Sequence, residues 1–466
     1  MAGASGWQAL DVERETKPPP RPLDLRGPAR CGCSRRACLR SAAALALTAL
    51  TAAIVPRLLE LSLPPLSLHA TDASLAYSGR WRFTDDRTAL ADWPCAALRL
   101  RLRLPANSSL VLSWYGVRLR LLASVRRLDA ATAAEHAVLT AYPLEVYGVR
   151  PPPIRSELRL AAAGEYSVEL TKLTDAAPFN MGLGRWLAAA RLRFDGVVLP
   201  AGATVLRAAP RRRRVEYVGA SDSSGYCVDG SSDDDNWRYA FVGWARQNCY
   251  KAAPMVLGRL FSADVQVVAL PASGVTQNAF AATPWLNGEP TMRQYYERAL
   301  LTDGPSSVWN FSRFVPDVVI LSLGGNDFNH QAALAPSNAT FDSSYMGMLG
   351  DVFAHYPSRP DLVVISVCGQ GSPREAAFDP DNNRCRPCEH VERATLQFAE
   401  AAPERRVHYL FVPCDGSVVT GVDDIGCDGH KNARGQAEVA SFLAPRIADI
   451  MGWQLGGMNE SDADGP

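Results

Sequence analysis

The sequence predicts an α/β domain built on a parallel sheet, preceded by an antiparallel β domain and a short membrane segment. Three observations lead to this prediction. Residues 211–452 alternate strand and helix patterns, which is typical of a parallel sheet covered by helices on both faces. Residues 75–210 contain short strands separated by Gly, Pro and Asn turns, which favours a β-sandwich. Residues 41–56 carry no charge and follow a cluster of arginines.

The N-terminal part predicts a tail, an anchor and a stalk. Residues 1–40 are rich in charge and proline and lack an apolar period, so we expect a disordered cytosolic tail. Residues 41–56 predict an uncleaved transmembrane signal anchor, although about 20 residues are usual for a span. Residues 57–74 form the stalk, and the folded domains then lie in the lumen of the secretory pathway or outside the cell. The alternatives are a cleaved signal peptide, which would make the protein secreted, a buried apolar helix, and a twin-arginine signal at Ser34-Arg35-Arg36.

The eleven cysteines divide into two groups. Three cysteines precede the apolar run, Cys31, Cys33 and Cys38. Reversible palmitoylation and unmodified thiols are two alternative interpretations of them. We expect most of the other eight to form disulfides, because they are an even set on the predicted lumenal side. A half zinc site at Cys385-Arg386-Pro387-Cys388 is the alternative, but it lacks a second pair at suitable spacing. The eight are Cys95, Cys227, Cys249, Cys368, Cys385, Cys388, Cys414 and Cys427.

Charge and composition restrict the classes of partner. The formal net charge is zero, which gives no argument for nucleic acid or another polyanion. Apolar residues make up 47% and charged residues 21%, as in an ordinary globular protein. Four Asn-x-Ser/Thr sequons could carry glycans if the chain is secretory, which would make it a glycoprotein. They begin at Asn107, Asn310, Asn338 and Asn459.

Within the β domain, leucine and arginine alternate strictly along residues 98–104, and a similar alternation follows along residues 117–121. A period of two places the leucines on a core face and the arginines on a wet face. A basic binding patch is the alternative interpretation, and we favour the solvated face of an antiparallel sheet.

Five buried strands and three helices are predicted for residues 211–452. The run Arg211–Arg214 precedes the first strand, and we interpret it as a solvated domain linker in preference to a processing site. Residues 453–466 predict a flexible tail. The strands are Val215–Val218, Val265–Leu270, Val318–Leu323, Leu362–Val367 and Val407–Val412, and the helices are Trp237–Asn248, Met292–Leu301 and Ala433–Met451.

A candidate nucleophile follows the first of these strands. The strand stops at Gly219, and Ser221 then presents a hydroxyl at the carboxyl edge of the sheet, where ligands of open α/β sheets bind. A serine hydroxyl needs a base and donors aimed at the developing oxyanion. Residues 323–327, Leu-Gly-Gly-Asn-Asp, follow another strand, and residues 426–430, Gly-Cys-Asp-Gly-His, lie near the C-terminus. Together these blocks predict a serine hydrolase.

The order of the blocks resembles the SGNH (GDSL-like) hydrolases, and among them the second family of carbohydrate esterases, which remove O-acetyl groups from polysaccharides. The resemblance covers about residues 75–452 and implies a jelly-roll β domain before a flavodoxin-like sheet. The chain departs from the family at Ala220, where the family has Asp, and at Cys227, where it usually has Gly. The family positions that it keeps are Glu216, Gly219, Ser221, Gly225 and Tyr226, with Tyr77–Arg80 and Val168–Asp175 in the β domain.

The catalytic residues expected from these blocks are Ser221 as nucleophile, His430 as base and Asp428 as the third member. Residues two apart do not easily turn both side chains together, so a backbone carbonyl that accepts from Nδ1–H of the imidazole is an alternative to the Asp428 carboxylate. Asp423 and Asp424 are further candidates for this carboxylate.

An oxyanion hole is expected from the backbone N–H of Ser221, the backbone N–H of Gly274 and the side-chain amide of Asn326. This scheme uses no cofactor and no metal. The acidic run at residues 231–235 lacks calcium-loop spacing, and we interpret it as a solvated loop.

The leading function is therefore a serine esterase that removes O-acetyl groups from a polysaccharide or glycan through an acyl-enzyme. A glycan O-acyltransferase, which would pass the acyl group to a sugar hydroxyl, is one alternative. A catalytically weak glycan-binding protein, suggested by Ala220, is another. A gap beyond about 5 Å between Ser221 Oγ and the His430 ring would favour the binding protein, because proton transfer needs hydrogen-bond contact.

Overall fold

The computed structural model describes residues 65–130, 133–141, 153–175, 191–208, 211–232, 243–279, 290–328, 335–369 and 385–456. All of these belong to one compact unit, Ser62–Pro466. The predicted tail and anchor, and the stalk up to residue 64, lie outside the described residues. Within the described ranges, no helix is both long enough and apolar enough to cross a membrane.

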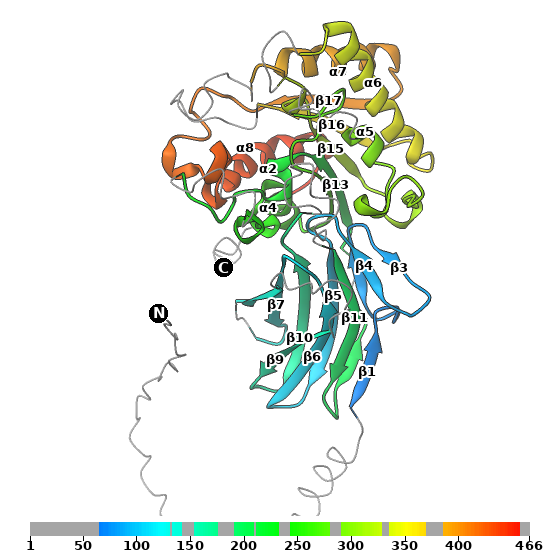
Figure 1. Cartoon of the computed structure of the whole chain (residues 1–466), viewed down its shortest axis with the longest axis vertical. Coiled ribbons are helices and arrows are strands. Elements are labelled where there is room, and N and C mark those ends of the chain that lie inside the picture. Colours follow the sequence, from blue (N-terminus) through cyan, green and yellow to red (C-terminus); the bar gives the residue numbers. More distant parts are fainter. Residues whose placement is uncertain are drawn as a thin grey trace, which may run out of the picture. The chain divides into compact units, whose positions relative to one another are not determined.

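The first part of the unit consists of two antiparallel sheets (Figure 1). One sheet has the order β3-β4-β11-β6-β9, with β1 paired to β11. The other has the order β12-β5-β10-β7-β8, with β2 paired to β5. The strands are β1 Leu66–His69, β2 Ala76–Ser78, β3 Arg82–Phe83, β4 Ala89–Ala91, β5 Ala97–Leu104, β6 Ser108–Tyr115, β7 Leu119–Arg127, β8 Glu135–Ala141, β9 Ile154–Leu160, β10 Gly164–Lys172, β11 Leu192–Leu199 and β12 Thr204–Leu206.

The alternating leucines of β5 form part of the core between the two sheets. They pack in one apolar cluster with residues of the other sheet such as Leu110, Leu112 and Phe194. The arginines between them lie on the opposite face and are half-buried or exposed. The period-two pattern thus placed leucine and arginine correctly on the two faces of the strand.

The second part of the unit is a five-stranded parallel sheet in the order β14-β13-β15-β16-β17. In chain order this is 2-1-3-4-5, the flavodoxin-like arrangement, whose switch point lies between the first and third strands. All five predicted strands are confirmed to within two residues at each end. Their bounds are β13 Arg213–Gly219, β14 Ala263–Ala269, β15 Val318–Ser322, β16 Val363–Cys368 and β17 Arg406–Phe411.

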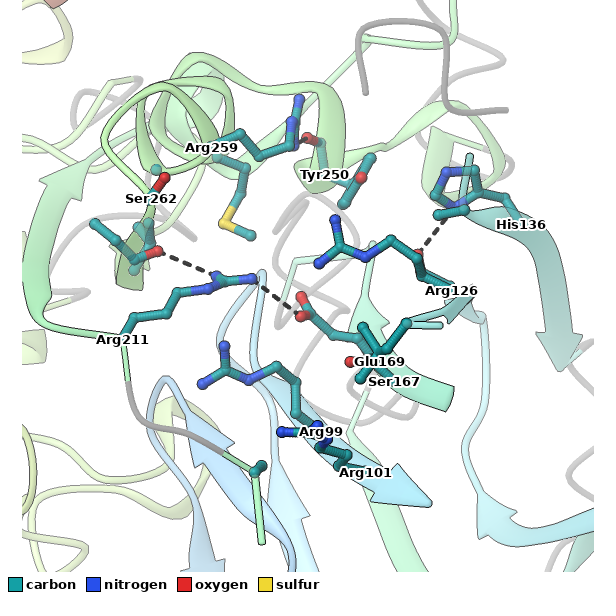
Figure 2. Close-up of a pocket in the computed structure, with 18 residues that line it drawn as sticks. Arg99, Arg101, Arg126, His136, Ser167, Glu169, Arg211, Tyr250, Arg259 and Ser262 are labelled. Carbon is teal, nitrogen blue, oxygen red and sulfur yellow. Dashed lines mark hydrogen bonds and ion pairs between the residues drawn. The ribbon is translucent and has the colours of Figure 1, made fainter. Parts of the chain in front are cut away.

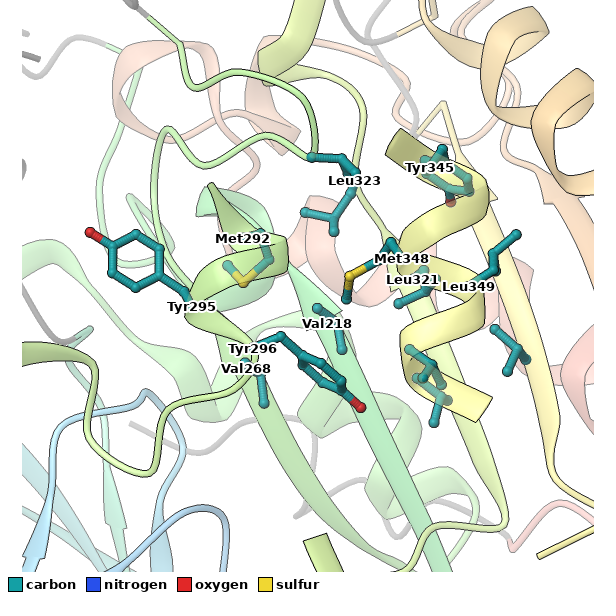
Figure 3. Packing of buried hydrophobic residues seen from close by; sticks show 14 of the residues in the cluster. Val218, Val268, Met292, Tyr295, Tyr296, Leu321, Leu323, Tyr345, Met348 and Leu349 are labelled. Carbon is teal, nitrogen blue, oxygen red and sulfur yellow. The ribbon is translucent and has the colours of Figure 1, made fainter. Parts of the chain in front are cut away.

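Helices bury both faces of this sheet. Helices α4 (Ala253–Leu260) and α8 (Ala433–Met451) share one apolar cluster with one set of strand side chains. Helices α5 (Met292–Tyr295), α6 (Asn338–His355) and α7 (Cys388–Ala401) share another with the opposite set. Figure 3 shows Met292, Tyr296 and Met348 packed beside strand residues of this second cluster. The described residues also contain short helical turns, α2 at Ser221–Ser224 and 3₁₀ turns at Gly243–Arg246, Cys249–Lys251, Leu301–Asp303, Phe311–Arg313, Asn326–Phe328, Val422–Asp424 and Cys427–Gly429.

Helix α8 has the predicted bounds because both ends are capped. The Asn432 side chain accepts hydrogen bonds from the backbone N–H groups of Arg434 and Gly435, and Gly452 ends the helix with a φ of 65°. The other two helix predictions were wrong in extent. Helix α5 ends at Tyr295, because the chain turns back and Arg298 pairs with Val308.

The described part of the predicted helix Trp237–Asn248 is a 3₁₀ turn, Gly243–Arg246. The backbone N–H of Asn248 donates to Gly225, and that of Asp229 donates to Arg246, so tertiary contacts set the path here. The interpretation of Arg211–Arg214 as a solvated linker also needs correction. Arg213 and Arg214 belong to β13, and the Arg213 guanidinium lies over the Trp453 ring and donates to the Phe261 carbonyl.

All eight predicted disulfide cysteines are paired, so that prediction is confirmed. Cys385 and Cys388 bind different partners, which removes the half zinc site as an interpretation. The bridge between Cys95 and Cys249 joins the antiparallel part to the α/β part. The pairs are Cys95–Cys249, Cys227–Cys427, Cys368–Cys388 and Cys385–Cys414.

A buried ion pair joins the same two parts of the unit. Arg80 Nη2 donates to Glu216 Oε1 over 3.2 Å, and both side chains are fully buried. Glu216 also accepts from the Tyr296 and Tyr356 hydroxyls and from Gln266. A buried charge is tolerated only where it is paired and hydrogen-bonded. The ion pair between Arg80 and Glu216 therefore holds the β-sandwich against the first parallel strand.

Candidate active site

A tight turn places Ser221 at the carboxyl end of β13. Helix α2 begins at Ser221, directly after β13 and Ala220, and Gly225 caps its C-terminus with a φ of 82°. A Cβ at Gly225 would lie 2.5 Å from the backbone of Asn248, so this position requires glycine. The short helix, closed by a left-handed residue, turns the chain back at once and leaves Ser221 at the sheet edge.

His430 contacts the hydroxyl of Ser221. The distance between His430 Nε2 and Ser221 Oγ is 2.8 Å, and His430 Nδ1 lies 2.8 Å from the backbone carbonyl oxygen of Asp428. Because a carbonyl oxygen only accepts, Nδ1 carries the proton in this contact. The neutral imidazole then presents Nε2 as the acceptor for the serine hydroxyl. This is the geometry of a base ready to remove the serine proton.

The sequence predicted several candidate partners for the imidazole of His430, and the structure shows the contacts of Asp428, Asp423 and Asp424. His430 Nδ1 contacts the backbone carbonyl of Asp428. This is the contact that the sequence analysis gave as the alternative to the Asp428 carboxylate. Asp428 has a φ of 54°, which turns its carbonyl toward the ring two residues later. Asp424 accepts from Thr420 and from Arg434, while Asp423 lies 3.8 Å from Arg434. Both thus engage the start of helix α8.

An ion pair and a disulfide connect the nucleophile turn to the histidine loop. Asp222, next to Ser221, lies 3.0 Å from Lys431, next to His430, and only 1% of the Lys431 side chain is exposed. Gln436 donates to the Asp222 carbonyl from helix α8. The Cys227–Cys427 disulfide adds a covalent link between the same two segments. Residues 209 positions apart in the chain are therefore held in register by bonds on both sides of the Ser–His contact.

Tyr226 packs its ring edge-on against the imidazole, with 4.7 Å between the ring centroids. Its side chain is buried together with Cys227 and Cys427. The aromatic ring covers one side of His430 and restricts its rotation, which further fixes the position of Nε2.

The expected oxyanion donors lie on the two neighbouring strand ends. Gly274 follows β14, and a Cβ there would lie 1.9 Å from the Gln277 carbonyl oxygen, so glycine is required. Asn326 follows β15, and its Nδ2 donates to the Ser273 carbonyl over 2.9 Å. This bond uses one of the two amide hydrogens and holds the amide beside the Gly274 loop. The Gly274 N–H donates to Asn278 Oδ1 over 3.2 Å, a contact that substrate would have to replace.

Asp327 fixes the loop that carries Gly274. Its fully buried carboxylate accepts from the backbone N–H groups of Val275, Thr276 and Gln277. Burial raises the pKa of Asp327 to about 6, and these three N–H donors act in the opposite direction. Asp327 lies in the Asn-Asp block at residues 326–327, but no role was predicted for it from the sequence. An acidic residue directly after a candidate donor was the available signal.

Ala220, the departure from the family pattern, is half-buried against the apolar cluster beneath the site. Two nearby carboxylates, Asp222 and Asp229, hold the nucleophile turn. Asp222 pairs with Lys431, and Asp229 accepts from Asn248 and pairs with Arg120 of β7. Sequence reasoning missed Lys431, because a lysine beside a polar loop is ordinarily exposed.

The expected nucleophile, base and oxyanion donors follow carboxyl ends of parallel strands. Ser221 follows β13 and Asn326 follows β15, the two strands that flank the topological switch point. Gly274 follows β14, and His430 comes after β17. The fold therefore gathers the predicted nucleophile, base and donors at the ligand-binding edge of the sheet, here called the reactive edge.

Two curated relatives of this chain are named as esterases. No protein-family model matches the chain. The chain is 24% identical over 390 residues to Cellulase/esterase CelE of Acetivibrio thermocellus, covering 81% of this chain and 40% of that protein. It is 23% identical over 243 residues to an acetylxylan esterase / glucomannan deacetylase of Cellvibrio japonicus, covering 52% of this chain and 58% of that protein. The chain thus spans about half the length of the curated relatives it matches.

Solved structures agree on the fold. A family two carbohydrate esterase from Cellvibrio japonicus aligns with a TM-score of 0.63 at 17% identity, over 84% of this chain and 99% of that one. The fold is that of a family two carbohydrate esterase. The resemblance inferred from the sequence is confirmed, because the curated relatives carry esterase names and solved family two carbohydrate esterases share the fold. A family two esterase from Clostridium thermocellum in complex with cellohexaose aligns at 0.60, with 20% identity over 82% of this chain and all of that one.

Proposed function

We propose that this chain is a serine esterase that removes O-acetyl groups from polysaccharide through an acyl-enzyme intermediate. The observation that carries the proposal is the 2.8 Å contact between Ser221 Oγ and His430 Nε2, with Nδ1 held by the Asp428 carbonyl. The esterase names of the relatives support the same chemistry. The ion pair and disulfide around the contact favour a preorganised centre over an incidental surface pair.

The first half-reaction transfers the acetyl group to the protein. Ser221 Oγ attacks the acetyl carbonyl carbon while His430 Nε2 takes the hydroxyl proton. The carbonyl electrons move onto the oxygen, which faces the N–H of Ser221, the N–H of Gly274 and the Asn326 amide. Collapse of this intermediate breaks the bond to the sugar oxygen, and His430 returns its proton to that oxygen. Acetyl-Ser221 and a free sugar hydroxyl remain.

The second half-reaction regenerates the serine. His430 takes a proton from water, whose oxygen attacks the acetyl-serine carbonyl, and the same donors hold the second oxyanion. Collapse expels Ser221 Oγ, which is protonated by His430, and releases acetate. The Asp428 carbonyl has one task in both halves, which is to keep the proton on Nδ1 and stabilise the imidazolium that forms.

An O-acyltransferase would share the first half-reaction and pass the acetyl group to a sugar hydroxyl. A similarity of fold to the Salicylyl-Acyltransferase SsfX3, with a TM-score of 0.51 at 15% identity, supports this second candidate. Addition of an unacetylated oligosaccharide distinguishes the two, since an esterase releases acetate whether or not the acceptor is present. Acetylated acceptor in place of acetate would identify the transferase.

The test of the proposal is turnover of acetylated xylan and of an aryl acetate. We expect Ser221→Ala and His430→Ala to lose turnover by several orders of magnitude, on the order of 10⁶-fold for loss of a serine nucleophile. Both variants should retain the wild-type circular dichroism spectrum. Ser417→Ala, at an exposed loop serine, is the matched control and should keep full activity. Undiminished turnover in Ser221→Ala would refute the mechanism, and an inert wild type that binds the glycan would favour the binding protein.

A further inference from the structure

A second cavity lies at the opposite edge of the parallel sheet. It has a volume of about 410 Å³ and lies between the outer face of the sheet that contains β5, β7 and β10 and the end of helix α4. Its α/β wall includes Gly258, Arg259 and Ala263, the residues where α4 ends and β14 begins. Seven strand residues at about 3.3 Å each separate this edge from the reactive edge, about 20 Å away. The cavity is therefore distinct from the candidate active site.

The cavity is lined by more cations than anions. Five arginines line it, and Glu169 is the carboxylate among its described lining residues. The arginines come from four separate segments, namely Arg99 and Arg101 from β5, Arg126 from β7, Arg211 before β13, and Arg259 from α4. Figure 2 shows Arg99, Arg126 and Arg211 gathered around the Glu169 carboxylate. The fold thus concentrates positive charge that is spread thinly along the sequence.

Nearby carboxylates neutralise only part of this charge. Asp264 lies 3.0 Å from Arg99 and 3.8 Å from Arg211, and Glu169 lies 3.4 Å from Arg211. Glu165 pairs with Arg101 and also with Arg103 outside the cavity. Among the described residues, no hydrogen bond or ion pair engages the side chain of Arg126. The Arg259 guanidinium lies over the Tyr250 ring and donates from Nη1 to the Tyr250 carbonyl. Positive charge is left over, and it faces a cavity large enough for a small ligand.

We propose that this cavity binds an anionic sugar unit of an acidic glycan, through its sulfate or carboxylate group. Guanidinium groups donate paired hydrogen bonds to such oxyanions and desolvate more readily than ammonium groups. The volume exceeds what a single oxyanion fills, and the Tyr250 ring and the Ser124, Ser167 and Ser262 side chains line the space left for a sugar ring. The solvated arginine face expected from the leucine–arginine alternation becomes a binding surface only where α4 closes over it.

The cavity would bind the glycan at a distance from the catalytic residues and would take no part in the reaction. Its occupancy leaves Ser221 and His430 untouched, so binding is measurable with an oligosaccharide that carries no acetyl group. Failure of the anion site and failure of the esterase proposal are consequently separable.

Isothermal titration calorimetry of the full chain tests the proposal with three probes. These are a chondroitin sulfate tetrasaccharide, inorganic sulfate and neutral cellotetraose. We expect the sulfated tetrasaccharide to bind, with an affinity that falls as salt is raised. Cellotetraose should not displace it, and inorganic sulfate should compete only weakly. Equal affinity for inorganic sulfate would overturn the assignment to a sugar, and no binding of the tetrasaccharide at low salt would overturn the site.

Substitutions locate the binding. Arg126→Gln removes a cation whose loss leaves no carboxylate without a partner, and we expect about threefold weaker binding. Arg99→Gln with Arg126→Gln should weaken binding at least about tenfold, while Arg211 remains beside Asp264. Arg159→Gln, at a largely exposed arginine of β9, is the matched control. Wild-type affinity in the double variant, with an unchanged melting temperature, would exclude this cavity as the binding site.

Discussion

At the reactive edge of the parallel sheet, charged side chains near the nucleophile are buried and matched, Asp222 with Lys431 and Asp327 with three backbone N–H groups. At the opposite edge, five guanidinium groups line a cavity together with one described carboxylate. Paired buried charges hold atoms in place, and removing one partner destabilises the fold because the other charge stays buried without compensation. Surplus half-exposed charges attract a ligand, and each can be removed at small cost to the fold.

Breaking the buried pair should have the largest effect. Lys431→Met leaves the Asp222 carboxylate buried without its cation, and we expect a loss of about 3–5 kcal/mol in the free energy of unfolding. The double variant Asp222→Asn with Lys431→Met removes both charges and should recover most of this loss. Urea unfolding followed by fluorescence measures both values. A double variant as unstable as the single variant would show that the pairing of charge is not what stabilises this edge.

Removing an oxyanion donor should act on turnover alone. We expect Asn326→Ala to lower kcat on the order of 10²–10³-fold with little change in KM, because the amide acts mainly on the transition state. Steady-state hydrolysis of an aryl acetate gives both constants. Asn310→Ala, at an exposed asparagine of a sequon, is the control for loss of an amide. Equal loss in the two variants, or a change confined to KM, would contradict the assignment of Asn326.

The buried carboxylate of Asp327 should make stability depend on pH. Its pKa is about 6 in the folded chain against 3.8 when exposed, so between these values the folded state holds a proton that the unfolded state has lost. The added stability is complete below pH 3.8 and is lost as the pH rises through about 6, amounting to at most about 3 kcal/mol. Asp327→Asn lacks this titration. The difference between the two unfolding free energies should therefore change across this window, and a constant difference would rule out the raised pKa.

Neutralising the opposite edge should have the smallest effect on catalysis. We expect Arg126→Gln to hydrolyse a small aryl acetate within about twofold of the wild type, because the cavity and the reactive edge are separated by the length of β14. Turnover at low and high salt measures this. A large loss of activity would mean that the two edges are coupled, and the contrast between them would then fail.

Local patterns predicted much of the fold and the centre of the site. The continuous apolar runs Val318–Leu323 and Leu362–Val367 specify buried parallel strands, and the Leu–Arg alternation specifies one strand of an antiparallel sheet. Ser221, Asn326 and His430 were recognisable because each lies in a short glycine-containing block after a buried strand or near the C-terminal helix. The two overextended helices failed because contacts with distant segments, such as that of Asn248 with Gly225, determine where those segments turn.

The sequence by itself determined which residue types meet at the carboxyl ends of the strands. The apolar runs that form the strands, and the glycines and polar residues that follow each run, are local features of the chain. Only the tertiary structure decided that Lys431 is buried against Asp222 and that the Asp428 carbonyl contacts the imidazole. It also decided that arginines from four segments converge in a protein whose net charge is zero. Charge balance is a sum over the chain, whereas the electrostatic potential at a cavity depends on the distances among side chains, which exist only after folding.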